Sequence, residues 1–335
     1  MKYIRLIVCM LLGGASLLSA QEGDKVFTFL RYPASSHVNA LGGQTVSLIE
    51  RDPALSFHNP ALLGGEMDGM LNLNYMNYIA GIYAGNVVYA KAFRERSAWG
   101  VGARFINYGS MKEVDASHVI LGDFSARDLS LNVFYSYDLS ERWRGGVSFG
   151  MLYSGLAEYT AFGLSVDAGL SYFDPENGMS YGLALKHIGA QVKAYDEKRE
   201  KLPWDIQLGL TKKMDHAPFR FSVTAMYLNR WKFGYVDASL NKTALDDNFV
   251  QTALKHLVFG IDFIPSESLW AGVGYNPKIA ADMQLKDGVN RLGGFSAGAG
   301  LRVSRFDLSV SVARFHPSAL SLMVGISVSF SEPAL

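Results

Sequence analysis

From about residue 70 onward, the chain repeatedly alternates apolar residues with small or polar ones. The last segment shows this most regularly, with apolar residues at every second position: Leu320, Leu322, Val324, Ile326, Val328 and Phe330. A period of two predicts β-strands with one apolar face. About fourteen such segments start near Met70, Tyr83, Ser97, Asp128, Arg142, Thr160, Met179, Pro203, Pro218, Leu254, Ser268, Gly294, Arg305 and Ala319. The pattern therefore predicts an all-β protein.

An even number of antiparallel strands, each of ~9–11 residues, is what a closed transmembrane barrel requires. A soluble β-sandwich is the alternative, because alternation alone does not distinguish lipid from a protein core. The connections favour the barrel. Those after even-numbered strands are short, whereas every long one follows an odd-numbered strand: 110–127, 190–202, 230–253 and 277–293. Short periplasmic turns and long outer loops are typical of outer-membrane barrels, so we expect a transmembrane antiparallel β-barrel of about 14 strands.

Residues 1–20 are predicted to be a signal peptide. Lys2 and Arg5 precede an apolar stretch, and Ser19-Ala20 offers a cleavage point before Gln21. An ordinary N-terminal helix is the alternative. The single cysteine, Cys9, lies inside this stretch, so the mature chain would form no disulfide. We expect three parts: signal peptide 1–20, N-terminal segment 21–66 and barrel 67–335.

The segment 21–66 lacks sustained alternation and contains Pro33, Pro53, Pro60 and the pair Gly42-Gly43. It would lie beneath the barrel or inside it as a plug. Many inward strand positions carry only glycine or serine, which leaves room for packed backbone or, alternatively, for a water-filled pore. Several charged residues also fall on the inward face, where they would pair, hold the segment or be hydrated: Arg104, Asp167, Lys186, Asp205 and Asp262.

Composition and motifs give little support for other functions. The 31 basic residues balance 31 acidic ones, which argues against nucleic-acid binding. Residues 146–150 match the G-x-S-x-G pattern of a serine nucleophile, but that motif needs a strand-to-helix turn and here lies within strand alternation. The seven histidines are scattered. We therefore predict no enzyme activity, no metal site and no cofactor.

The N-terminal segment resembles the opening of a known family. Residues 29–37 (FLRYPASSH) lead into 40–43 (ALGG), then 46–52 (VSLIERD) and 59–63 (NPALL). Together these are similar to the PorV/PorQ family of FadL-like outer-membrane barrels, and most like the PorQ branch, which belongs to the type IX secretion system. The strand count and Leu202-Pro203-Trp204 before a strand also fit, so the resemblance covers the mature chain.

The resemblance implies a non-enzymatic adaptor in the cell outer membrane, surrounded by lipid. It would anchor a PorZ-like surface protein in the attachment complex, together with PorU- and PorV-like proteins. The family's hatch maps to Ala40, Leu41, Gly42, Gly43, Asn59 and Pro60. The partner would dock on the loop 230–253, with Trp231, Tyr235, Asp246 and Asp247 as candidates, although a solvated loop tip explains the two aspartates better than a contact with a cation or a basic partner. The alternative function is a FadL-like transporter of small hydrophobic compounds; a general porin is a third.

Overall fold

The structure, a computed structural model, describes residues 25–114, 120–196, 198–231, 233, 235–237, 242–244, 248–283, 292–316 and 319–331. The predicted signal peptide with Cys9 lies outside the described residues, as do Asp246 and Asp247.

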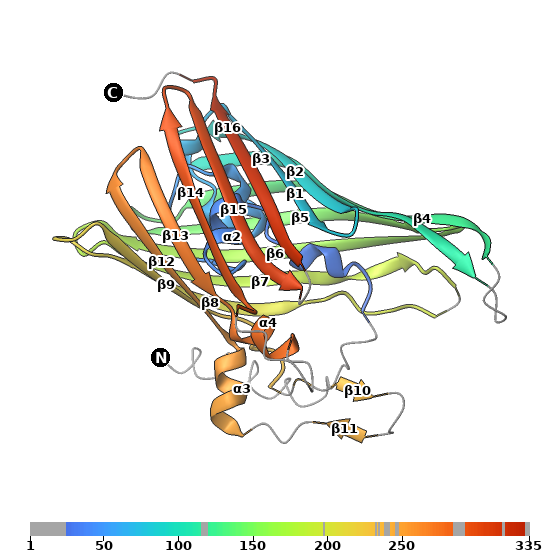
Figure 1. Cartoon of the computed structure of the whole chain (residues 1–335). Coiled ribbons are helices and arrows are strands. Elements are labelled where there is room, and N and C mark those ends of the chain that lie inside the picture. Colours follow the sequence, from blue (N-terminus) through green and yellow to red (C-terminus); the bar gives the residue numbers. More distant parts are fainter. Residues whose placement is uncertain are drawn as a thin grey trace, which may run out of the picture.

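In the described part of the chain, fourteen antiparallel strands close into one barrel (Figure 1). The barrel strands are β1 (Met70–Ile79), β2 (Ile82–Phe93), β3 (Ser97–Val114), β4 (Ile120–Asp138), β5 (Trp143–Leu156), β6 (Tyr159–Asp174), β7 (Met179–Lys193), β8 (Asp205–Lys213), β9 (Phe219–Ala225), β12 (Leu257–Ser266), β13 (Leu269–Tyr275), β14 (Phe295–Val303), β15 (Phe306–His316) and β16 (Ala319–Ser329). The ring closes where β1 pairs with β16, with Met70 opposite Ser329. The predicted fold class is confirmed.

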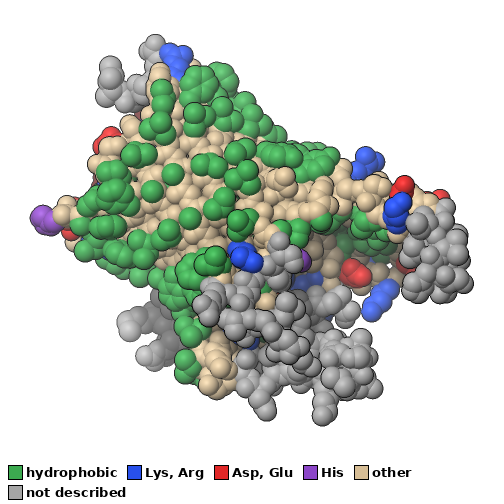
Figure 2. All heavy atoms as spheres, in the orientation of Figure 1, with side chains coloured by type: hydrophobic (Ala, Val, Ile, Leu, Met, Phe, Trp, Pro, Cys, Tyr) green, Lys and Arg blue, Asp and Glu red, His purple; other side chains and the backbone are tan. Residues whose placement is uncertain are grey.

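Alternation places apolar side chains outside and polar ones inside. On β16, the outward Leu322 and Val324 are 46% and 44% exposed, whereas the inward Ser321 is buried. Figure 2 shows hydrophobic side chains spread over the barrel wall. Aromatic rings also gather at strand ends, where Trp143 and Tyr172 lie 4.9 Å apart. The outward apolar side chains, with aromatic rings at the strand ends, form a band around the barrel. This band, the lipid-facing belt, is the surface that a transmembrane barrel presents to lipid. Among the described residues, no helix is long and apolar enough to cross a membrane.

The two ends of the barrel differ as predicted. At one, the turn end, connections such as Arg94–Arg96 are short. At the other, the loop end, lie α3 (Phe249–Lys255), α4 (Pro277–Asp282) and the small sheet of β10 (Tyr235–Asp237) and β11 (Lys242–Ala244). The loop end also holds one tight turn, in which Ala80 and Gly81 both have positive φ. Paired positive φ angles fit a two-residue hairpin.

Two predicted boundaries were wrong. Residues 110–114 and 120–127 belong to strands and not to a loop, because β3 continues to Val114 and β4 already starts at Ile120. Lys112 lies opposite Asp123 in this extension. Where the β3–β4 hairpin extends beyond the lipid, both of its faces meet water. Its sequence there no longer alternates apolar with polar residues, which is the pattern used to predict strands. The segment expected to start near Leu254 begins as α3, and β12 starts at Leu257.

The N-terminal segment, residues 25–69, lies inside the barrel and crosses its length. At the loop end, Val26 N–H donates to Lys201 O at 3.2 Å. At the turn end, Glu66 forms an ion pair with Arg144 at 3.1 Å. Between them the chain forms only short helices: η3 (Thr28–Arg31), α2 (Ser36–Ala40), η4 (Pro53–Phe57), η5 (Pro60–Leu62) and η6 (Gly65–Met67). The prolines and glycines of this stretch account for its irregular path.

Candidate functional site

The predicted hatch residues 40–43 form the end of α2 and lie against the wall. Ser35 caps the helix, because its Oγ accepts a hydrogen bond from His37 N–H at 3.2 Å. The chain then turns through Gly42 and Gly43, with φ of 93° and 87°, a left-handed conformation that glycine adopts without steric cost. Gly42 N–H donates to Ser296 Oγ at 2.9 Å. The A-L-G-G sequence therefore ends a helix and attaches it to β14.

The wall facing this turn is built from glycine. A Cβ added at Gly274 would lie 2.1 Å from Gly42 N, and one at Gly298 would lie 2.8 Å from Ala40 Cβ. At Gly260 it would lie 3.0 Å from Leu41 Cβ. Side chains therefore have no room at these inward positions. At this part of the wall, the small inward residues make room for the backbone of the N-terminal segment, as predicted.

Asn59 and Pro60 make a similar contact with a different part of the wall. Asn59 Oδ1 accepts from Ala61 N–H at 2.9 Å and so caps η5, while Asn59 Nδ2 donates to Val46 O at 2.8 Å. A Cβ at Gly169 on β6 would lie 1.9 Å from Asn59 Oδ1. The six predicted hatch residues thus form two attachments, one on β12–β14 and one on β5–β6, and not a single site.

A buried charged cluster joins α2 to the strands near the turn end. His37 Nδ1 lies 2.7 Å from Glu50 Oε2, and His37 Nε2 lies 2.8 Å from Asp262 Oδ1. Arg220 bridges the two carboxylates, at 2.6 Å from Glu50 and 2.7 Å from Asp262. The His37 ring also stacks on Trp270, with centroids 3.5 Å apart. Asp262 was predicted to face the barrel interior, but its partners were not predicted. Arg220 could have been found from its inward position between the outward Phe219 and Phe221 on β9.

The carboxylates around His37 decide its charge. Burial alone would lower the pKa of His37, but Glu50 and Asp262 outweigh it and raise that pKa to about 9. Burial would raise the pKa of Glu50, yet Arg220 and His37 lower it to about 2. His37 is therefore protonated and Glu50 ionised at neutral pH. The cluster holds two cations and two anions, and is electrically balanced.

The other predicted inward charges also face the interior, and two of them hold the segment directly. Arg104 donates to Leu30 O at 3.3 Å. Lys186 donates to Phe57 O and lies 3.6 Å from Asp167. Asp205, which is also buried, accepts from Gln207 Nε2 at 2.8 Å. Arg104 and Lys186 thus satisfy backbone carbonyls that the short helices leave without partners. The interpretation that inward charges hold the N-terminal segment applies to Arg104, Lys186 and Asp262.

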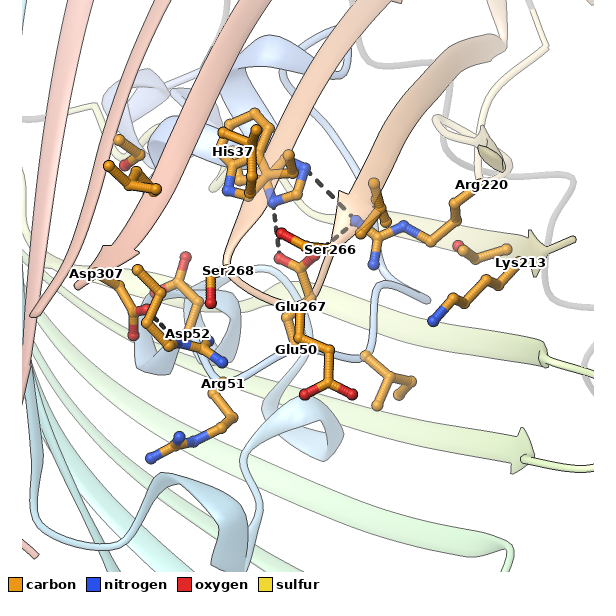
Figure 3. Close-up of a pocket in the computed structure, with 18 of the residues that line it drawn as sticks. His37, Glu50, Arg51, Asp52, Lys213, Arg220, Ser266, Glu267, Ser268 and Asp307 are labelled. Atoms are coloured by element: carbon orange, nitrogen blue, oxygen red, sulfur yellow. Dashed lines mark hydrogen bonds and ion pairs between the residues drawn. The ribbon is translucent and has the colours of Figure 1, made fainter. Parts of the chain in front are cut away.

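A cavity of about 500 Å³ lies beside the charged cluster at the turn end (Figure 3). Side chains of both signs line it, including Arg51, Asp52, Lys213 and Glu267. Burial raises the pKa of Asp52 to about 6, although the Ser35 hydroxyl that donates to it opposes the shift. The mixture of charges is unlike the mostly apolar lining of a pocket for a hydrophobic compound.

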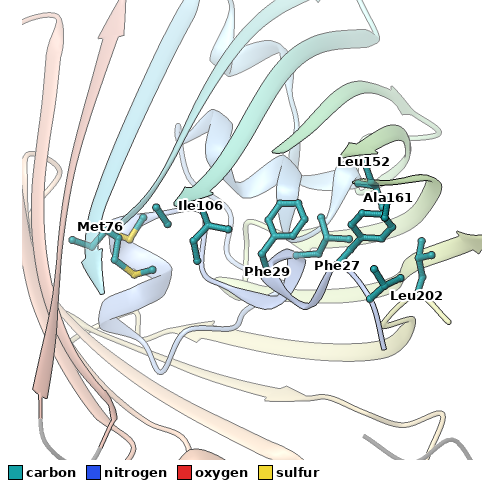
Figure 4. Close-up of a cluster of buried hydrophobic side chains, with 11 residues drawn as sticks. Phe27, Phe29, Met76, Ile106, Leu152, Ala161 and Leu202 are labelled. Atoms are coloured by element: carbon teal, nitrogen blue, oxygen red, sulfur yellow. The ribbon is translucent and has the colours of Figure 1, made fainter. Parts of the chain in front are cut away.

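One cluster of apolar side chains lies in the loop-end part of the interior (Figure 4). Buried side chains from the N-terminal segment and the wall pack together here: Val26, Phe27, Phe29, Leu30, Met76, Ala84, Ile106, Leu152, Ala161, Leu202 and Met323. A cavity of about 20 Å³ borders Phe29 and Ile106, which is enough for about one water molecule. An apolar compound could occupy this cluster only if side chains moved.

The predicted docking residues are described in part. Trp231 is 48% exposed and stacks on His256, with ring centroids 4.8 Å apart. Tyr235 begins β10, in the small sheet at the loop end.

Ser148 of the G-x-S-x-G match is buried in the middle of β5, so the strand interpretation of that motif is confirmed. Within the described ranges, no cluster of His, Cys, Asp and Glu could hold a metal ion.

Comparison with known proteins finds similarity in structure alone. No model of a protein family matches the sequence, and no characterised protein matches it. Among solved structures, the CymD monoaromatic hydrocarbon channel has a TM-score of 0.58 at 12% identity, covering 92% of this chain and 100% of that one. The toluene transporter TodX of Pseudomonas putida has a TM-score of 0.54 at 15% identity, covering 91% and 100%. A FadL homologue of Pseudomonas aeruginosa has a TM-score of 0.52 at 11% identity, covering 89% and 98%.

At these identities the similarity establishes the fold: the chain forms a FadL-like barrel. Two of these solved structures are described as a transporter and a channel. The finer assignment to the PorV/PorQ family stays a prediction.

Proposed function

We propose that this protein is an outer-membrane barrel through which small hydrophobic compounds pass. The fold supports the proposal, since similar structures include a toluene transporter and a monoaromatic hydrocarbon channel. Within this chain, the observation that supports the proposal is the apolar cluster at the loop end. There, Phe27 and Phe29 of the N-terminal segment pack on apolar residues of the strands. Apolar side chains at the entrance to the lumen are the surface that a hydrocarbon would bind.

In this proposal the N-terminal segment closes the lumen and must shift for a compound to pass. Below the apolar cluster, the backbone of residues 40–60 packs on wall glycines without space for a Cβ. The cavity beside Phe29 is also far smaller than a monoaromatic ring. A compound that binds at the apolar cluster would therefore have to displace the N-terminal segment, and its binding free energy would supply the work. A compound can shift such an equilibrium only through its differential affinity for the two states.

Uptake of toluene by cells with and without the protein tests this function. We expect uptake that depends on the protein and rises when Phe29→Ala opens the cluster. Phe149→Ala is the matched control, because Phe149 is 45% exposed on the lipid face of β5. Equal uptake with and without the protein, at equal amounts of inserted barrel, would contradict the proposal.

A second candidate function is the adaptor of the type IX secretion system that the N-terminal sequence suggests. The close fit between the segment and the wall favours it, since a filled, rigid barrel suits a scaffold better than an open channel. The elements outside the barrel at the loop end supply a surface for a PorZ-like partner, with PorU- and PorV-like proteins in the same complex. Export by residues 1–20 would place the turn end in the periplasm and the loop end outside the cell.

Replacing residues 232–247 by a Gly-Ser linker of equal length tests the adaptor. This change removes β10 and β11 but leaves Trp231, α3 and the barrel. We expect the surface partner to be lost from the complex purified in mild detergent, while toluene uptake stays unchanged. An unchanged set of co-purifying proteins would rule out docking on residues 232–247. N-terminal sequencing of the purified barrel, expected to begin at Gln21, tests the signal peptide.

A further inference from the structure

The short helix α3 at the loop end is amphipathic, but its apolar side faces outward. At ~100° per residue, Phe249, Ala253, Val250 and Leu254 fall on one continuous arc of the helix. Gln251, Lys255 and Thr252 fall on the opposite arc. Phe249, Val250 and Leu254 on the apolar arc are 72%, 63% and 44% exposed. Gln251 on the opposite arc is exposed as well, and α3 has no buried residue, so its large apolar side chains are not covered by the barrel. A water-facing helix would show the reverse pattern.

Specific contacts hold α3 in this orientation. Asn248 and Gln251 form a capping box at its N-terminus. Trp231 lies 5.3 Å from the Phe249 ring and stacks on His256, which directly follows the helix. His256 is itself buried, and its Nδ1 lies 2.8 Å from Met226 O at the end of β9. The exposed arc is therefore fixed relative to the barrel wall.

The apolar arc continues the lipid-facing belt. α3 ends one residue before β12 starts, and Phe259 on the outward face of β12 lies opposite Tyr275. Tyr275 in turn packs on the outward Phe295, with ring centroids 4.7 Å apart, at the loop-end margin of the belt. Figure 2 shows hydrophobic side chains running from the barrel wall onto the side of this helix.

We propose that α3 and Trp231 bind the lipid surface at the loop end of the barrel. The apolar arc enters the interface between headgroups and acyl chains, and the arc with Gln251 and Lys255 faces water. An exposed tryptophan beside an amphipathic helix is typical of such interfacial contacts. The helix fixes the position of the loop 230–253 relative to the membrane. This inference is independent of what the barrel transports or anchors.

Single-cysteine labelling of the full chain in phospholipid vesicles tests the proposal. The sequence has one cysteine, Cys9, so a Cys9→Ser background makes each introduced thiol unique. An NBD fluorophore is attached to Val250→Cys, Leu254→Cys or Lys255→Cys. Quenching is then measured with a phospholipid spin-labelled near its headgroup and, separately, with aqueous iodide.

Two further positions calibrate the quenching. Val310→Cys reports lipid, because Val310 is 46% exposed on the outward face of β15, and Glu176→Cys reports water at an exposed turn. We expect the probes at Val250 and Leu254 to be quenched by the labelled lipid and protected from iodide, and the probe at Lys255 to show the reverse. Iodide quenching at Val250 and Leu254 equal to that at Glu176, without quenching by lipid, would overturn the proposal and leave this face for a protein partner.

Discussion

Pro60 lies so close to Gly146 that a Cβ added to the glycine would be 2.3 Å from the Pro60 carbonyl carbon. The neighbouring Gly145 faces outward, and its added Cβ would meet nothing closer than Leu139 Cδ1 at 3.5 Å. Two adjacent glycines on β5 therefore have opposite constraints. The difference indicates that the wall is shaped to hold the N-terminal segment, because the three atoms nearest to the added Gly146 Cβ all belong to Pro60 and Ala61.

This pair gives the first prediction. We expect Gly146→Ala to lower the free energy of unfolding by about 1–3 kcal/mol, the usual cost of overpacking a core, and to loosen residues 57–63. Gly145→Ala should change it by less than about 0.5 kcal/mol. Urea unfolding of the barrel, with limited proteolysis of the N-terminal segment, measures both. Equal effects of the two substitutions would show that the segment does not press on the wall at Gly146.

The second prediction concerns the buried cluster around Asp262. Asp262→Asn leaves His37 and Arg220 with one carboxylate between them, and breaking a buried pair costs about 3 kcal/mol or more. Asp307→Asn is the matched control, because the Arg302–Asp307 pair at 2.5 Å is about one-third exposed, and such pairs contribute about 1 kcal/mol or less. Urea midpoints of both variants test this difference. A loss for Asp262→Asn no larger than for Asp307→Asn would contradict the role given to the cluster.

The third prediction is a pH dependence from His37. The pKa of His37 is about 9 in the folded chain and 6.5 for the free side chain, so its stabilising effect is complete below pH 6.5 and is lost as the pH rises through 9. The charged groups that face the ring are the carboxylates of Glu50 and Asp262 and the guanidinium of Arg220. Hydrogen exchange of the α2 amides, corrected for the intrinsic rate, should accelerate between pH 6.5 and 9.5.

His37→Gln provides the control for this effect. Glutamine does not titrate, so the variant should exchange faster at pH 6.5 and lose the extra acceleration at pH 9.5. Corrected exchange that is the same at both pH values in the original chain would mean that the charge of His37 does not hold α2.

The sequence predicted the barrel better than its interior. Alternation located all fourteen barrel strands because lipid on one side and a packed lumen on the other impose a period of two. It failed where both faces of a strand meet water, as beyond Ser110 on β3. The residues of the two attachments were marked by Gly42, Gly43 and Pro60, since these residue types signal unusual backbone.

The contacts between the N-terminal segment and the wall were beyond the sequence. His37 and Asp262 are 225 residues apart, and no local pattern pairs them. The exposed arc of α3 was not predicted for another reason: residues 249–253 were assigned to the loop 230–253 and Leu254 to the start of a strand, so this short helix was divided between the two. Docking at Trp231 stays a prediction, and its packing beside Phe249 of α3 was not foreseen.

The central claim is that the N-terminal segment closes the lumen of this barrel. Single-channel conductance of the purified chain in planar lipid bilayers tests it most directly. We predict no stepwise conductance from the intact protein and open-pore steps from a variant in which a Gly-Ser linker replaces residues 27–66. Steady open-pore conductance from the intact protein would contradict the claim.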